Sequence, residues 1–346
     1  LHCGKSLNNH FAELSEDGSA SFGGSMQYAK IEGTDLCAGK IVLGTDRFGS
    51  DIPKEDAFRL MDMFLDGGGN LLDTAHVYAD WKCKIKSVSE KTIGAWVKER
   101  GNRDRVILST KGGHPDTEHM DISRLSKEEI LSDLEGSLRN LGTDYVDLYW
   151  LHKDDEKIPA GALCEILNEI LSSGKARAIG VSNWRFERIC EANKYAEAHG
   201  LHKIKLSQVQ YSIARVNPPS VTPDIHVLDE KEYEEYVQAK MQVFAFSSQA
   251  RGYFSVMEKG GESALSDSVR NAYANEYNRA LFSRLEKFSK DRGVPCSAAV
   301  LAALLCDSRL SCFALASSDK PIRLSEILRF ADFSMSDAER ETLLRG

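Results

Sequence analysis

"RVILSTKGGHPDTEHMDISRLSKEEILSDLEGSLRNLG" (residues 105–142) joins a short apolar run to an amphipathic helical pattern. The run at 105–112 predicts a buried strand, and Ser126 with Glu129 has the capping-box spacing that begins a helix. The same order of apolar run and helical pattern recurs along the chain. Further strands are predicted at 40–45, 70–75, 146–152, 176–183, 206–212, 242–248 and 312–318.

The predicted strands are nearly continuous in apolar residues, and helical patterns separate them. Such strands pair in parallel and are covered by helices. Eight strand–helix units favour an α/β fold of the (β/α)8 TIM-barrel type, with a parallel eight-stranded core. An open doubly wound sheet would carry a G-x-G-x-x-G turn after its first strand, and "LGTDRFGSD" (43–51) lacks that turn.

The first 25 residues differ from the rest of the chain. They are rich in serine and glycine and include "SEDGSASFGGS" (15–25), which predicts a flexible N-terminal segment or linker. The regular pattern begins with a predicted β-hairpin at 26–38, so residues 26–346 are assigned to the barrel domain. Because the chain begins with Leu1 and not with methionine, a processed chain, a trimmed chain and an additional preceding domain all remain open.

Composition excludes several classes of protein. A net charge of −8 argues against a general nucleic-acid binder, which needs a basic surface. No apolar run approaches the ~20 residues of a membrane span, and no secretory signal pattern opens the chain. The eight cysteines contain no C-x-x-C and the histidines no H-E-x-x-H. These patterns predict free thiols in a reduced, cytoplasmic protein and no structural metal.

Four reactive side chains are predicted to converge on one face. The C-terminal ends of barrel strands open on the same side, where active sites are built. Three successive predicted strands end at Asp73, Lys111 and His152, and Tyr78 follows Asp73 in a loop on the same side. Each residue alone is more often structural, as a turn cap, a lysine reaching solvent, a core histidine or a rim aromatic. Their convergence favours a shared active site.

Six segments follow one another along the chain: "MQYAKIEGTDLCAGKIVLGT", "LLDTAHVY", "ILSTKGG", "DYVDLYWLH", "ARAIGVSNW" and "SQVQYS". Together they closely resemble the aldo-keto reductase family, in its bacterial-type members. The resemblance covers essentially the whole chain from Met26. It implies a (β/α)8 barrel that reduces carbonyls with NADPH or NADH and without a metal. It also places the family's catalytic tetrad on Asp73, Tyr78, Lys111 and His152.

The chemistry of carbonyl reduction suits these four side chains. The reaction needs a hydride on carbon and a proton on oxygen. Tyr78 is expected to donate the proton, and the Lys111 ammonium is expected to lower the pKa of the Tyr78 phenol. Asp73 would hold Lys111 in place, and His152 would orient the substrate oxygen.

The resemblance also implies a cofactor site across the same face. Ser182, Asn183 and Gln208 match residues that bind the nicotinamide carboxamide. Phe246 matches an aromatic residue that stacks on the nicotinamide ring, although a barrel-core aromatic is an equally good explanation from the residues alone. The remaining candidate cofactor contacts are Thr45, Asp73, Ser247, Gln249, Arg251, Gly252, Ser317, Ser318 and Arg323.

The match to the family's 2′-phosphate clamp is partial. Arg323 matches its arginine, but Ser317 stands where many members have lysine. Asp319 adds a negative charge nearby, for which Lys320 would compensate. NADP(H) is therefore preferred as the cofactor, and NAD(H) stays open.

The substrate is expected to be a small-molecule carbonyl. Asp46 and Lys153 stand where many family members have apolar or aromatic residues, and Asp154 and Asp155 follow. These charges either face a polar pocket suited to a sugar or keto-sugar or are solvated loop residues. Trp81 and Trp184 are candidates for a flat wall of that pocket.

Two other functions remain open at this point. Some members of the family act as nicotinamide-sensing regulatory subunits and not as enzymes. The same groups would also catalyse oxidation of an alcohol or sugar alcohol, because the reaction is reversible.

Overall fold

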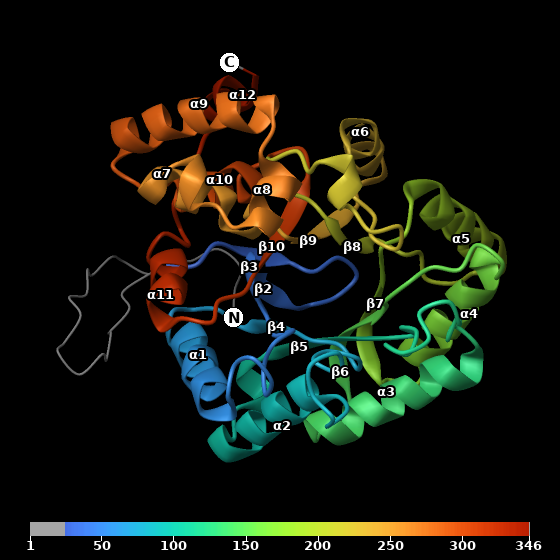
Figure 1. Cartoon of the computed structure of the whole chain (residues 1–346). Helices are drawn as coiled ribbons and strands as arrows, with labels where there is room; N and C mark the ends of the chain where they lie inside the picture. Colours follow the sequence, from blue (N-terminus) through green and yellow to red (C-terminus); the bar gives the residue numbers. More distant parts are fainter. Residues whose placement is uncertain (1–24, 346) are drawn as a thin grey trace.

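The computed structural model describes residues 25–345, which form a closed barrel of parallel strands surrounded by helices (Figure 1). The order around the barrel is β10-β3-β4-β5-β6-β7-β8-β9, so the predicted (β/α)8 TIM barrel is confirmed. The predicted flexible segment at 1–25 lies, apart from Ser25, outside the described residues. The barrel strands are β3 (Ile41–Gly44), β4 (Leu71–Asp73), β5 (Ile107–Gly112), β6 (Val146–Leu151), β7 (Ala176–Ser182), β8 (Leu206–Gln210), β9 (Gln242–Phe246) and β10 (Ser311–Ala316).

A short hairpin closes the N-terminal end of the barrel. β1 (Tyr28–Lys30) and β2 (Cys37–Gly39) pair antiparallel, which confirms the hairpin predicted at 26–38. Ile31 and Leu36 between them pack against Val42, Leu71 and Ile107, which begin or nearly begin their strands. The opposite, C-terminal end of the barrel therefore remains as its mouth.

Side chains at alternate strand positions fill the barrel interior. Trp150, Phe244 and Phe313 are fully buried there, with ring centroids 4.9 Å apart for the first pair and 4.6 Å for the second. Gly180 of the adjacent strand makes room for Trp150, since a Cβ at this position would lie 2.4 Å from the indole ring. This tightly packed layer fixes the strands directly below the mouth.

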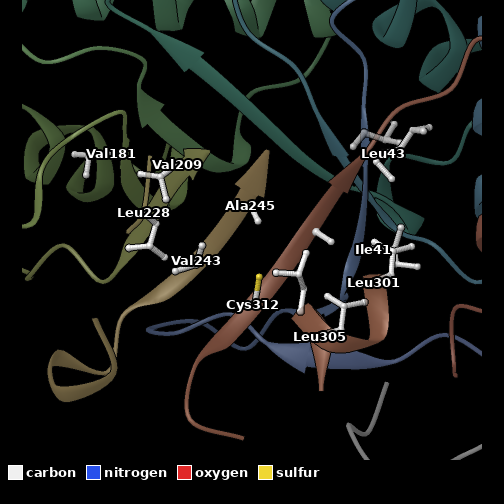
Figure 2. Packing of buried hydrophobic residues seen from close by; sticks show 14 of the residues in the cluster. Ile41, Leu43, Val181, Val209, Leu228, Val243, Ala245, Leu301, Leu305 and Cys312 are labelled. Atoms are coloured by element: carbon white, nitrogen blue, oxygen red, sulfur yellow. The ribbon is translucent and has the colours of Figure 1, made fainter. Parts of the chain in front are cut away.

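The other face of each strand packs against the helices. Figure 2 shows Ile41 of β3 beside Leu301 of α10, and Leu43 belongs to the same buried cluster. The helices around the barrel are α1 (Lys54–Asp66), α2 (Val88–Arg100), α3 (Lys127–Leu141), α4 (Ala160–Ser172), α5 (Phe186–His199), α6 (Glu230–Ala239), α10 (Cys296–Leu305) and α11 (Pro321–Arg329).

The predicted capping box at the start of α3 is present. Ser126 Oγ accepts a hydrogen bond from the Glu129 amide at 3.3 Å, and the Glu129 carboxylate accepts one from the Ser126 amide at 3.4 Å. Gly142 ends the helix with a φ of 68°, a left-handed conformation that glycine adopts without strain.

Additional helices lie between β9 and β10 along the chain. Figure 1 shows α7, α8, α9 and α10 grouped beside these two strands, with α12 packed on α9. The remaining helices of the chain, including the short 3-10 helices, are η1 (Arg103–Arg105), η2 (Pro218–Ser220), η3 (Ala250–Gly252), α7 (Tyr253–Gly260), η4 (Glu262–Ala264), α8 (Asp267–Tyr273), α9 (Glu276–Arg292) and α12 (Asp337–Arg345). Within residues 25–345, no helix combines the length and apolar character needed to cross a bilayer.

Candidate active site

Strand alternation carries the reactive side chains to one level at the mouth. Asp73 lies two residues beyond the inward-facing Leu71 on β4, and Lys111 lies two beyond the inward-facing Ser109 on β5. His152 lies two residues beyond the inward-facing Trp150 on β6. Because side chains alternate between faces, all three point toward the barrel axis just above the apolar layer.

Lys111 and Asp73 form a buried ion pair. The Lys111 Nζ lies 2.5 Å from the Asp73 Oδ2, and both side chains are essentially inaccessible to solvent. The ammonium also donates to the backbone oxygen of Thr74 at 2.7 Å. Burial lowers the pKa of Lys111, while the charge and hydrogen bond of Asp73 oppose that shift. The pair is thus held in one geometry by several contacts.

The second oxygen of Asp73 is also occupied. Its Oδ1 accepts a hydrogen bond from Ser109 Oγ at 2.7 Å and another from Gln208 Nε2 at 3.1 Å. Ser109 in turn accepts from the Trp150 indole at 2.7 Å, which links the ion pair to the apolar layer below. Gln208, predicted as a cofactor contact, therefore supports Asp73 in this structure.

Tyr78 completes the group from the loop at 74–87. Its phenolic oxygen lies 3.0 Å from Lys111 Nζ, and its ring lies beneath the same ammonium at 4.5 Å. The next residue, Ala79, is buried and has a φ of 71°, a left-handed conformation that is strained for alanine. The backbone beside Tyr78 is therefore held by its surroundings.

The predicted lowering of the Tyr78 pKa is wrong. Burial raises the pKa of Tyr78 well above the ordinary value near 10, and the negative charges of Asp73 and Asp46 add to that shift. The Lys111 ammonium that was expected to oppose it is neutralised by Asp73 at 2.5 Å. Tyr78 is consequently a protonated phenol across the ordinary pH range, ready to donate.

His152 lies beside Tyr78 as a neutral imidazole. Burial lowers its pKa well below the ordinary value, and the positive charges of His114, Lys111 and Lys153 act in the same direction. The ring centroids of Tyr78 and His152 lie 5.7 Å apart in an edge-to-face contact, and those of His114 and His152 lie 4.7 Å apart. The structure thus brings together all four residues predicted for the catalytic group.

A cavity of about 1120 Å³ opens beside these residues. It runs from Asp73 and Tyr78 past the end of β9 to α7, η4, α8 and α11. This volume slightly exceeds the ~300–1,000 Å³ that is usual for small-molecule sites. The predicted cofactor residues that line it are Thr45, Asp73, Phe246, Ser247, Gln249, Arg251, Gly252, Ser317 and Arg323.

Four other predicted cofactor residues, Ser182, Asn183, Gln208 and Ser318, do not line this cavity. Ser182 and Gln208 are buried. Asn183 donates to the His152 carbonyl at 3.3 Å and accepts from the His226 amide at 3.2 Å. Ser318 donates from its hydroxyl to the Lys320 carbonyl at 2.9 Å, which shapes the turn before α11.

Two of the four predicted substrate-pocket residues line the cavity, namely Asp46 and Trp81. Trp184 is completely buried, and its indole donates to the Lys153 carbonyl at 3.1 Å. Lys153 is also buried and pairs with Asp224. Trp184 and Lys153 do not line this cavity, and their assignment to the substrate pocket stays a prediction.

A model of the Aldo/keto reductase family matches residues 40–344. The chain belongs to the aldo-keto reductase family. This match confirms the resemblance drawn from the six sequence segments.

Relatives of this aldo-keto reductase carry several names. "Uncharacterized oxidoreductase YrpG" of Bacillus subtilis is 34% identical over 193 residues, covering 54% of this chain and 59% of the relative. "Norsolorinic acid reductase stcV" of Emericella nidulans is 28% identical over 287 residues, covering 80% and 69%. "Aryl-alcohol dehydrogenase GME11368" of Pestalotiopsis microspora is 31% identical over 192 residues, covering 53% and 48%. The chain thus spans about half to two thirds of the length of these relatives.

A crystal structure supports the fold. The thermostable aldo-keto reductase Tm1743, in complex with the inhibitor epalrestat, matches with a TM-score of 0.69 and covers 92% of this chain and 98% of that chain. The identity is 23%, so this likeness concerns the barrel architecture alone.

Several residues of the aldo-keto reductase site were not predicted from the sequence. Ser109 contacts Asp73, and its position two residues before Lys111 on a strand was a signal for the same face. Lys259 of α7 lines the far end of the cavity beside Glu326, and no motif in the sequence marked this lysine. Within the described residues, no cluster of three or more His, Cys, Asp or Glu side chains has the geometry of a metal site.

Proposed function

We propose that this aldo-keto reductase reduces an aldehyde or ketone to an alcohol with NADP(H), and that Tyr78 is the general acid. The observation that carries this proposal is the position of the Tyr78 hydroxyl. It lies 3.0 Å from Lys111 Nζ on the wall of a cavity of about 1120 Å³. A proton donor and a space large enough for a dinucleotide therefore meet at one place.

The residues at the mouth divide the reaction among them. A reduced nicotinamide held along the cavity would supply the hydride for the carbonyl carbon. Tyr78 gives its phenolic proton to the carbonyl oxygen, and neutral His152 offers a ring N–H that orients the same oxygen. Lys111, held by Asp73, stabilises the negative charge that develops on the Tyr78 oxygen as the proton leaves. Lys111 thus acts on the charged form of Tyr78, although the resting phenol stays protonated.

The cavity fits a dinucleotide along its length. Phe246 lines the cavity and is proposed to support the nicotinamide ring, and the segment 247–252 follows with left-handed backbone at Ser247, Ala250 and Arg251. Backbone of this kind can present amide groups to an anion, and the first turn of α7 begins directly after it. The segment 247–252 is therefore proposed to hold the pyrophosphate.

Turnover separates an enzyme from a nicotinamide-sensing subunit. We expect the purified protein to oxidise NADPH when an aldehyde is added, measured by the loss of NADPH absorbance. The reverse assay, with NADP⁺ and the matching alcohol, should also proceed, because the same groups serve both directions. Dinucleotide binding without turnover in either direction would support the sensing subunit and exclude the proposed function.

The cofactor preference rests on cationic side chains at the far end of the cavity. Arg323 and Lys259 line it, although each is near a carboxylate, at 3.3 Å from Asp319 and 3.4 Å from Glu326 respectively. Arg323 offers a planar set of N–H donors that suits a 2′-phosphate. We expect Arg323→Met to weaken NADPH binding about tenfold or more, because hydrogen bonds to charged groups contribute ~1.5–3 kcal/mol, and to leave NADH binding unchanged.

Fluorescence titrations with both dinucleotides measure this preference. Arg329→Met, at the opposite end of α11, provides the matched control because its guanidinium lies near Phe330 and does not line the cavity. NADH binding at least tenfold tighter than NADPH binding to the unchanged protein would reverse the assignment.

Asp46 provides the remaining support for a hydroxylated substrate such as a sugar or keto-sugar. It lines the cavity, and no described residue offers its carboxylate a side-chain hydrogen bond. Burial raises the pKa of Asp46, with Arg47 and Lys111 opposing the shift. A hydroxyl near the reacting carbonyl would give this desolvated carboxylate a partner. Trp81, which is 47% exposed at the rim, and the aromatic names among the relatives favour an aryl carbonyl as the second candidate.

Matched carbonyls distinguish the two substrate classes. We expect kcat/KM to be higher for glyceraldehyde than for propanal, and the Asp46→Leu variant to lose this preference by about tenfold because a hydrogen bond to a charged group is removed. Asp46→Asn keeps an acceptor oxygen and should retain part of the preference. Uniformly better rates on propanal and benzaldehyde in the unchanged protein would contradict the polar pocket and favour the aryl class.

We also propose that the protein is cytoplasmic, the location predicted from the cysteine pattern of the sequence. Cys164, Cys296 and Cys312 are buried free thiols, and burial raises the pKa of Cys296 and Cys312 to about 12. Such thiols are unreactive and suit a reducing compartment.

A further inference from the structure

A cluster of charged side chains lies behind the loop that carries Tyr78. His76, two residues before Tyr78, contacts α2 and α3 and does not line the cavity. Its Nδ1 lies 3.4 Å from the Glu90 carboxylate of α2, and its Nε2 lies 3.9 Å from the Asp133 carboxylate of α3. The Ser137 hydroxyl lies 3.4 Å from the same Nδ1. One imidazole therefore joins the loop to two helices.

The chain makes room for this imidazole. Gly136 lies inside α3, where glycine is a poor helix former. A Cβ at Gly136 would lie 2.6 Å from the Cε1 of His76, closer than such atoms approach. The glycine thus leaves a notch that the His76 ring occupies, which fixes where the ring can sit.

Glu90 requires the positive charge of His76. The Glu90 side chain is completely buried and accepts hydrogen bonds from Thr110 at 2.6 Å and from Asn140 at 2.9 Å. Among the described residues, His76 is the only cationic side chain within 4.0 Å of it. Asp133, by contrast, has its own partner in Arg124 at 2.7 Å. A buried carboxylate is costly without a paired charge, so the His76–Glu90 contact stabilises the fold when His76 is protonated.

Short backbone links connect His76 to the reacting groups. The His76 amide donates to the Lys111 carbonyl at 2.9 Å, and the Tyr78 amide donates to the Ala75 carbonyl at 3.1 Å. Movement at His76 would therefore shift both partners of the contact between Lys111 and Tyr78. We propose that His76 is a positioning residue for Tyr78: by bridging Glu90 and Asp133 it holds the loop so that the phenol stays against Lys111.

This arrangement makes the loop sensitive to pH near neutrality. Burial alone lowers the pKa of His76, but the contact with Glu90 and the charges of Glu90, Asp133 and Asp80 outweigh it and raise the pKa above the ordinary value of 6.5. The pKa of His76 is higher in the folded protein than in the unfolded chain. The stabilisation of the folded state by the protonated imidazole is therefore complete below pH ~6.5 and is lost as pH rises through the folded pKa. Tyr78 does not ionise in this range, since its pKa is well above 10. The pKa values of His114 and His152 are lowered, so these residues titrate below 6.5.

The test compares His76→Gln with the unchanged protein across pH, and it rests in part on the proposed carbonyl reduction. We expect His76→Gln to lower kcat about tenfold at low pH while NADPH affinity changes little, because the disturbed loop carries the proton donor and none of the proposed dinucleotide contacts. The unchanged protein should show a decline in kcat above pH ~6.5 that is absent from the variant. His199→Gln, a swap of an exposed histidine on α5, should behave as the unchanged protein does.

The double variant His76→Gln/Glu90→Gln guards against simple misfolding. It removes both charges, so it should regain the thermal stability that the single variant loses. The double variant should not regain the kcat of the unchanged protein or the decline of kcat with pH. A single variant with the kcat and pH profile of the unchanged protein would overturn the proposal. A double variant that recovers kcat together with stability would also overturn it, since the role would then be structural.

Hydrogen exchange provides a readout that does not need turnover. In the unchanged protein, exchange of the amides at 74–87 should quicken as pH rises through the pKa of His76, after correction for intrinsic rates, and His76→Gln should exchange quickly at every pH. If no carbonyl is reduced but this pattern is seen, the proposed function fails and the positioning role stands. If exchange is equal in the two proteins, the positioning role fails whatever the activity.

Discussion

Replacing Tyr78 by phenylalanine is expected to lower kcat for carbonyl reduction by about 10²–10⁴-fold, the usual contribution of a positioned general acid. The phenol is the hydroxyl nearest to Lys111, and its raised pKa keeps the proton available for transfer. Phenylalanine preserves the ring contacts with His152 and Trp81. NADPH affinity should therefore change little, and the loss should fall on kcat.

Steady-state kinetics and a fluorescence titration of the same preparation measure both quantities. Tyr233→Phe is the matched control, because its hydroxyl bonds Asp307, away from the cavity, at 2.7 Å. Full activity in the Tyr78→Phe variant would contradict the assignment of Tyr78 as the general acid.

Replacing Lys111 by methionine should abolish turnover and also lower the free energy of unfolding by about 3–5 kcal/mol. The variant leaves Asp73, which is 1% exposed, as a buried carboxylate without its cation. The hydrogen bonds from Ser109 and Gln208 remain on one of its oxygens, but they supply no opposite charge. Removing one partner of a buried ion pair costs more free energy than the intact pair contributes to stability, because the other charge is left buried and unpaired.

A second variant separates stability from chemistry. Lys111→Met/Asp73→Asn removes both charges, so urea unfolding should show that most of the lost stability returns. Activity should not return, because the charge that stabilises the Tyr78 oxygen is absent. Equal stability of Lys111→Met and the unchanged protein would mean that Asp73 is compensated by other groups.

The barrel and its central group were predictable because both follow from strand periodicity. Apolar runs located the strands, and the C-terminal ends of neighbouring parallel strands must meet. Asp73, Lys111 and His152 could therefore be placed at one level without coordinates. The confirmed hairpin and the capping box at Ser126 likewise depend on local patterns.

Features that depend on distant partners could not be predicted in this way. Lys153 forms an ion pair with Asp224 and the Trp184 indole donates to the Lys153 carbonyl, and neither partner is marked by spacing in the sequence. The pKa of Tyr78 was misjudged for a related reason. The sequence shows that a lysine is near, but it does not show that the site is desolvated or that Asp73 already neutralises the lysine.

The interior layer around Trp150, Phe244 and Phe313 also bears on how the protein can evolve. The strand ends that carry Asp73 and Lys111 rest on this layer, whereas Asp46 and Trp81 lie on connecting loops. Loops accept substitution and insertion more readily than packed strands. Descendants of this chain can therefore acquire new substrates through changes at the rim while inheriting the proton-transfer group intact.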